Sequence, residues 1–418
     1  MVRARSEPGN SCQKANLARR YTRQCVNSAF IGIFYVRRHC HLFPGRNLLT
    51  MPPSAIPTLR VEALDLLRLV AVLGVVLYHF GFWGPASHGV PQVALPWLTP
   101  IAKYGFLGVP AFFVISGFVI AYSAEGRTAT GFAIARFSRI YPTFVFCMTL
   151  TFLAIAVLGV PHFDTSVKQW LANLFIAAPA FGQPYMDASY WSLVIEVMFY
   201  AWVAVLIAAG LFPRRIDTII LIWLGITFAN ELTLDAPLVE KLFLTDYSGF
   251  FAVGLLIYQF YRGRRGPVLY GLLALSIGTA VFQSIHEAVK LAPHTGGVFD
   301  AWTVAAICLA SIAIVFLTTR VRHVPLPSAL VLAAGGLTYP LYLLHMQFGY
   351  VLFAGQAPAN ALPWVVAIVL AMTWLAWIVW RYVERPAQRW VRDFLSGRAV
   401  RFGWPLKLPV AVRSSGGA

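Results

Sequence analysis

Two ionisable residues, Arg68 and His79, lie eleven positions apart in one apolar stretch. At about 100° per residue, eleven steps complete three turns plus about 20°, so a helix would place both side chains on one face. If Arg68 marks the membrane boundary, a rise of about 1.5 Å per residue puts His79 roughly 16 Å deeper, near the middle of the lipid. A histidine there can act as a general base. The alternative is a packing histidine that is hydrogen-bonded to a neighbouring helix.

A carboxylate, Glu196, occupies another apolar stretch one helical turn after Ser192. Such a carboxylate needs a partner or a raised pKa. A proton relay, a ligand for a substrate hydroxyl and a structural pair with arginine or histidine all fit this pattern.

Two further patterns place polar groups at helical spacing. Arg136 and Arg139 follow the second apolar stretch, and their spacing would place both guanidinium groups on one side of a helical turn, where they could bind phosphates. The alternative is that these arginines only anchor a cytoplasmic loop. Tyr339, Tyr342 and His345, at offsets of three and six, would follow one helix flank and line a cavity, although tyrosines are common at membrane interfaces.

The composition indicates what positions these residues. Of 418 residues, 59% are hydrophobic and 12% are charged, whereas soluble domains are about 45–50% apolar and 25% charged. This excludes a soluble globule and predicts an all-α polytopic membrane protein with about ten transmembrane helices. We expect them near 64–83, 101–122, 140–160, 188–211, 216–233, 243–261, 267–286, 300–319, 331–354 and 363–383, with 169–182 interfacial or re-entrant.

The net charge of +17 supports this topology rather than nucleic-acid binding. Arginines gather in every second connection, whereas the alternate connections hold at most one lysine each and collect acids such as Asp187. Because cytoplasmic loops are rich in basic residues, this predicts that both termini are cytoplasmic. The arginines are Arg127, Arg136, Arg139, Arg214, Arg215, Arg262, Arg264, Arg265, Arg320 and Arg322.

The two ends are expected to lie outside the membrane domain, which we place at residues 55–392. Residues 1–50 carry nine of the basic residues and one acid, with no cleavable signal pattern. We expect translation to start at Met51, the alternative being a disordered basic leader. Residues 393–418 are expected to form a short basic cytoplasmic tail. The cysteines show no metal-ligand spacing.

Six motifs in a fixed order resemble the acyltransferase-3 family, membrane-bound O-acyltransferases that modify carbohydrates and other hydroxyl compounds. The resemblance spans about residues 59–390. Leu69-Val70 replaces a usual glycine, and the closing box is shortened. The first three motifs are Arg68 with His79; Phe112-Phe113 with Ser116-Gly117-Phe118; and Arg136 and Arg139 with Tyr141-Pro142. The last three are Trp191-Ser192-Leu193 with Glu196; the group of Tyr339, Tyr342 and His345; and Tyr382 with Glu384 and Pro386.

The resemblance implies that an acyl group, usually acetyl from acetyl-CoA, is transferred to a hydroxyl of a surface polysaccharide, lipopolysaccharide or exopolysaccharide unit at a bacterial inner membrane. His79 would be the general base or acyl carrier, with Arg68 and Glu196 also catalytic. Arg136 and Arg139 would bind the donor. The acceptor or cavity residues would be Ser116, Trp191, Ser192, Tyr339, Tyr342, His345 and Glu384.

The implied partners are acyl-CoA, the hydroxyl acceptor and the lipid bilayer, with no permanently bound cofactor, no metal and no nucleic acid. Many family members carry a further extracytoplasmic hydrolase-like domain after the membrane helices, whereas the sequence here continues only briefly past the tenth expected helix. We therefore expect acceptor choice to rest in the bundle or on a separate extracytoplasmic protein. A transporter or flippase of acyl or sugar intermediates also explains buried His, Glu and Arg, but we see no inverted repeat. A lipid or sterol sensor would not need the ordered motifs.

Overall fold

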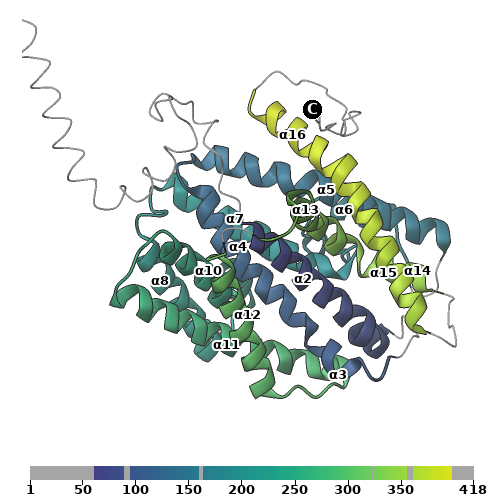
Figure 1. The fold of residues 1–418 in the computed structure, drawn as a ribbon, viewed down its shortest axis with the longest axis horizontal. Coiled ribbons are helices and arrows are strands. Elements are labelled where there is room, and N and C mark those ends of the chain that lie inside the picture. The colour runs from purple at the N-terminus through teal and green to yellow at the C-terminus, as the bar shows by residue number, and fades with distance from the viewer. Residues whose placement is uncertain (1–60, 89–94, 160–162, 322–323, 355–360, 398–418) are drawn as a thin grey trace, which may run out of the picture. The chain divides into compact units, whose positions relative to one another are not determined.

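The computed structural model describes residues 61–88, 95–159, 163–321, 324–354 and 361–397 (Figure 1). The expected leader 1–50 and most of the expected tail lie outside these residues. The described part contains helices and no strand, which confirms the all-α prediction there. The helices are α2 (Glu62–Tyr78), α3 (Thr99–Ala102), α4 (Gly108–Ala124), α5 (Ala129–Leu158), α6 (Val167–Asn173), α7 (Trp191–Ala208), α8 (Ile216–Ala229), α9 (Pro237–Phe243), α10 (Ser248–Tyr261), α11 (Pro267–Thr295), α12 (Ala301–Thr318), α13 (Ser328–Leu344), α14 (Gln347–Phe353), α15 (Ala361–Ile378) and α16 (Arg385–Leu395).

Long apolar helices dominate the described chain. Nine helical stretches there are long and apolar enough to cross a membrane, and a tenth is added if the bent pair α13 and α14 counts as one span. Helices suit this setting because each satisfies its own backbone hydrogen bonds where no water is present. The prediction of about ten spans is confirmed.

The helix that carries the two predicted donor arginines differs from the sequence-based prediction. We expected Arg136 and Arg139 in a loop ahead of a helix at 140, but α5 begins at Ala129 and includes both. The Thr128 side chain caps this helix by accepting a hydrogen bond from the backbone N–H of Gly131. The prediction was wrong because apolarity marked only the part suited to lipid, whereas arginine is also a good helix former.

The centre of the bundle is built around α2, which packs against α4 on one side and α13 on the other (Figure 1). Small residues let the neighbouring helices approach closely. Gly117 of α4 and Gly254 of α10 face each other, and a Cβ on either would collide with the opposite backbone. These contacts hold α4 and α10 side by side.

Regular helix geometry changes at two points beside this centre. A π-helical segment, His79–His88, continues directly from α2. The other change follows Leu344, where α13 ends and α14 continues at an angle of 71°, so the span expected at 331–354 is broken. Each break therefore presents a histidine, His79 or His345, as the first residue after a regular helix. Such irregular turns often occur at functional sites.

Candidate active site

The two histidines at the helix breaks contact each other. Nδ1 of His79 lies 3.0 Å from Nε2 of His345, and the ring centres are 4.7 Å apart. His345 is fully buried, and its Nδ1 lies 2.6 Å from the backbone oxygen of Tyr342. Nδ1 of His79 also lies 2.9 Å from the backbone oxygen of Val75. A pair of imidazoles is thus held between two carbonyl groups.

These contacts define the proton positions of the neutral rings. A carbonyl only accepts, so His345 must donate from Nδ1 to Tyr342 O, which leaves its Nε2 as an acceptor. Nδ1 of His79 then donates toward Val75 O and His345 Nε2. In this arrangement the lone pair of His79 lies on Nε2, the form that a general base requires.

A hydroxyl network fixes the helix turn behind the histidines. The Ser192 hydroxyl and the Tyr342 hydroxyl are 2.5 Å apart, and each lies 3.1 Å from the backbone oxygen of Ser189. The structure therefore brings together three predicted residues, Ser192, Tyr342 and His345. Tyr339 instead donates to the backbone oxygen of Ile140 on α5 at 3.1 Å.

A fully buried carboxylate that the sequence analysis did not select, Asp187, supports the same turn. One oxygen accepts from the backbone N–H of Gln347 at 2.8 Å, at the start of α14. The other accepts from the backbone N–H and the hydroxyl of Ser189, at 2.9 and 2.6 Å. Burial raises the pKa of Asp187 to about 6. Asp187 thus joins the segment before α7 to the break after His345.

A second group of ionisable residues lies where α2, α5 and α7 meet. One oxygen of Glu196 accepts from the Ser116 hydroxyl at 3.1 Å and from the Tyr200 hydroxyl. The guanidinium of Arg136 lies over the ring of Tyr200, 5.9 Å from its centre. Arg68 interacts electrostatically with Arg139 and Glu196. The structure therefore brings Arg68 and Arg136 near Glu196, with Arg139 near both arginines.

Arg68 also has a carboxylate partner within its own helix. Its guanidinium lies 3.4 Å from Asp65, one turn earlier in α2. The Arg68 side chain retains 19% exposure. A guanidinium has five N–H donors, so Arg68 can pair with Asp65 and still donate to an anionic ligand.

Two buried polar atoms near the arginines have no hydrogen-bond partner among the described residues. They are Nε of Arg136 and one carboxylate oxygen of Glu384, a residue with 6% exposure that interacts electrostatically with Arg139. Buried polar atoms in native proteins are normally paired, so such atoms call for an explanation. A bound anion would supply the missing acceptor for Arg136.

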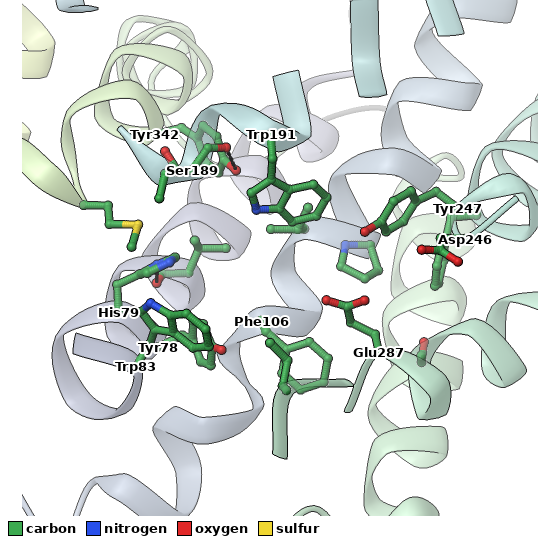
Figure 2. A pocket seen from close by; sticks show the side chains of 18 of the residues that line it. Tyr78, His79, Trp83, Phe106, Ser189, Trp191, Asp246, Tyr247, Glu287 and Tyr342 are labelled. Carbon is green, nitrogen blue, oxygen red and sulfur yellow. Dashed lines mark hydrogen bonds between the residues drawn. The ribbon is translucent and has the colours of Figure 1, made fainter. Parts of the chain in front are cut away.

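A cavity of about 250 Å³ lies on the other side of the histidine pair (Figure 2). His79, Tyr78 and Trp83 form one end, and Asp246 and Glu287 form the other. Ser189, Trp191 and Tyr342 lie along the wall between these two ends. Of the predicted site residues, His79, Trp191 and Tyr342 line this cavity. The predicted residues that do not line it are Arg68, Ser116, Arg136, Arg139, Ser192, Glu196, Tyr339, His345 and Glu384.

Sequence reasoning missed the acidic end of the cavity. Glu287 is a carboxylate next to an apolar stretch, which is the signal that selected Glu196, but the helix was expected to end at residue 286. In the structure α11 continues to Thr295 and carries Glu287 into the cavity wall. Asp246 falls within the span expected at 243–261 but was not selected, and the structure places it in the short connection before α10.

Comparison with known proteins identifies a family. The sequence model of the acyltransferase-3 family, described as an acyltransferase domain, matches residues 61–381. The exopolysaccharide production protein ExoZ of Rhizobium meliloti is 28% identical over 68% of this chain and 90% of its own length.

Two further relatives match over shorter regions. The peptidoglycan O-acetyltransferase OatA of Listeria monocytogenes is 29% identical over 35% of this chain and 24% of its own length. The acyltransferase MdmB of Streptomyces mycarofaciens is 30% identical over 36% of this chain and 39% of its own length. No solved structure matches the chain.

Proposed function

We propose, from the premise that this chain belongs to the acyltransferase-3 family and is an O-acyltransferase, that it transfers an acetyl group from acetyl-CoA to a carbohydrate hydroxyl. The acceptor would be a sugar unit of a surface polysaccharide, lipopolysaccharide or exopolysaccharide. The name of ExoZ, which aligns over most of both chains, supports a polysaccharide acceptor. The reaction would take place at the cell membrane.

The observation that carries the proposal is the histidine pair, in which His79 lines the cavity and His345 supports it from behind. The acceptor hydroxyl donates a hydrogen bond to Nε2 of His79. Its oxygen attacks the thioester carbonyl while its proton passes to Nε2. His79 then carries a positive charge, which Val75 O and Nε2 of His345 stabilise by accepting from Nδ1. When the carbon–sulfur bond breaks, the CoA thiolate leaves, and the proton on His79 returns to that sulfur.

The arginine group would hold the donor. Arg136 and Arg139 lie one turn apart on α5 near Arg68, and bidentate arginines suit phosphate groups. The unpartnered Nε of Arg136 supports an anionic ligand there. We assign Glu196 a positioning role, because it is bonded to Ser116 and Tyr200 beside the arginines and does not line the cavity.

The predicted topology would give the two substrates separate approaches. The arginine group lies near the beginnings of α2 and α5, which follow segments predicted to be cytoplasmic. The cavity is bordered by the beginning of α7, the connection before α10 and the end of α11, all on the side predicted to be extracytoplasmic. Acetyl-CoA would thus enter from the cytoplasm and meet the acceptor beside His79.

Mass spectrometry of cell-surface glycans tests this proposal. We expect a strain lacking the protein to lose acetyl groups from one glycan species. The wild-type chain should restore them, whereas His79→Ala should not, although it accumulates in the membrane to the same level. Unchanged acylation of every surface glycan in the deletion strain would reject the proposed reaction.

A further inference from the structure

We propose that the cavity beside His79 binds a single sugar ring that presents hydroxyl or ammonium groups and no carboxylate, and that Tyr78 and Glu287 select this ring. The inference rests on the proposed function, because it assigns the acceptor to this cavity. It adds a charge requirement for the acceptor, which Glu287 enforces, and a hydrogen-bonding contact from Tyr78 to the ring. Three independent features of the cavity support it.

The first feature is a buried hydroxyl that has no partner. Tyr78 is 4% exposed, and its hydroxyl makes no hydrogen bond among the described residues. Its ring is held edge-to-face against His79 at 5.0 Å and packs near Phe106 at 6.0 Å. Figure 2 shows the hydroxyl pointing into the cavity. A buried hydroxyl without a partner is unfavourable, so a ligand that hydrogen-bonds to it is stabilised at this point.

The second feature is the charge at the far end. Asp246 and Glu287 both line the cavity, and Asp246 is neutralised by Lys290 at 2.9 Å. No ion pair is formed by Glu287 within the part of the chain that the structure describes. An ionised carboxylate accepts hydrogen bonds and cannot donate them. This end therefore favours hydroxyl or ammonium groups and repels a uronic acid or another anionic sugar.

The third feature is the shape of the cavity and its aromatic wall. Trp191 and Tyr247 lie on the same wall, with ring centres 5.5 Å apart and planes inclined at 31°. An apolar wall with a few fixed polar groups is typical of small-molecule sites, and sites for drug-sized ligands begin at about 300 Å³. At about 250 Å³ this cavity suits one ring rather than an oligosaccharide.

The positions of the polar groups also define how the ring is oriented. His79 and Glu287 lie at opposite ends of the cavity (Figure 2). The hydroxyl that is acylated must therefore lie across the ring from the group that Glu287 binds. Tyr78 lies at the same end as His79, so its hydroxyl contacts the ring near the acylated position.

Binding of simple glycosides, measured without an acyl donor, tests the inference. The purified full-length protein is titrated with methyl glucoside, methyl glucosaminide and methyl glucuronide while tryptophan fluorescence is recorded. We expect saturable binding of the first two and at least about tenfold weaker binding of the glucuronide, the size of one lost charged hydrogen bond. Equal binding of all three, or binding of none, would overturn the inference.

Variants then assign the selection to residues. Glu287→Gln should bring the affinity for methyl glucuronide to within about threefold of that for methyl glucoside, and Glu287→Asp should retain the discrimination. Tyr78→Phe should weaken the neutral and the charged glycosides alike. Glu240→Gln is the matched control, because Glu240 lies near Asp246 but does not line the cavity. If Glu240→Gln changes selectivity as Glu287→Gln does, the selectivity comes from the long-range electrostatic effect of the acidic residues and not from a contact in the cavity, and the inference fails.

The outcome is separable from that of the proposed function. Selective binding without any acetyl transfer from acetyl-CoA would reject the proposed reaction and keep the sugar site. Acetyl transfer by a protein whose cavity variants bind every glycoside as the wild type does would reject the sugar site and keep the reaction.

Discussion

Replacing His345 with phenylalanine removes the side-chain group that orients His79 while filling a similar volume. In the structure a single contact of 3.0 Å joins the two rings, and the second acceptor of His79, the backbone oxygen of Val75 at 2.9 Å, is unaffected. The lost contact is a neutral hydrogen bond in the resting state. It becomes a bond from a charged donor when His79 has taken up the proton.

The expected loss of rate follows from that change. A hydrogen bond to a charged group contributes about 1.5–3 kcal/mol and a neutral one about 1 kcal/mol, so the transition state loses about 0.5–2 kcal/mol more than the resting state. Because each 1.36 kcal/mol is about tenfold in rate, His345→Phe should lower kcat by about 2- to 30-fold. The KM for the acceptor should change little, because His345 does not line the cavity. His345→Gln should recover part of the rate, since its amide oxygen can accept from His79.

Initial rates of CoA release from acetyl-CoA by the purified protein in liposomes measure this effect. Thermal unfolding of each variant serves as the control for folding. A kcat within twofold of the wild type would refute the positioning role. A loss as complete as that of His79→Ala would also refute it, because His345 would then be performing the chemistry itself.

Three other perturbations test separate parts of the site. Arg139→Ala should raise the KM for acetyl-CoA about tenfold and leave the acceptor KM unchanged, as steady-state kinetics with each substrate varied will show. Tyr200→Phe removes one hydrogen bond to Glu196 and should likewise affect the donor KM, by about two- to tenfold, in the same assay. Burial raises the pKa of Asp187 from 3.8 to about 6, so the folded protein favours the protonated carboxyl group. The stabilisation that this protonated group gives the folded state is present below about pH 4 and is lost as the pH rises through 6. The free energy of unfolding of wild type relative to Asp187→Asn should therefore fall by up to about 3 kcal/mol between pH 4 and 7, and a flat difference in thermal melts would contradict this.

The sequence predicted the features that depend on local composition. Apolar stretches gave the helical class and about ten spans, because a helix in lipid must be apolar over most of its length. The ordered motifs indicated the family that the comparison confirmed. The grouping of Arg68 and Arg136 near Glu196, with Arg139 near both arginines, was harder to predict, since these residues come from three helices.

Features that depend on helix ends and chain reversal were not predictable in the same way. The stretch around Leu344 and His345 continues the apolar pattern, so nothing local marks the break that turns His345 toward His79. The two rings are 266 residues apart in sequence, and only the packing of α13 on α2 joins them. Asp187 was interpreted as a loop acid, because its burial results from the later docking of α14.

The measurement that tests the central claim most directly is the rate of acetyl transfer by His79→Ala. It is compared with the wild-type rate in liposomes of the same composition, at an acetyl-CoA concentration that saturates both proteins. We predict that the variant binds the donor with an unchanged dissociation constant and transfers no acetyl group to the acceptor above the uncatalysed rate. Transfer at the wild-type rate would show that the histidine pair is structural and that the base lies elsewhere in the protein.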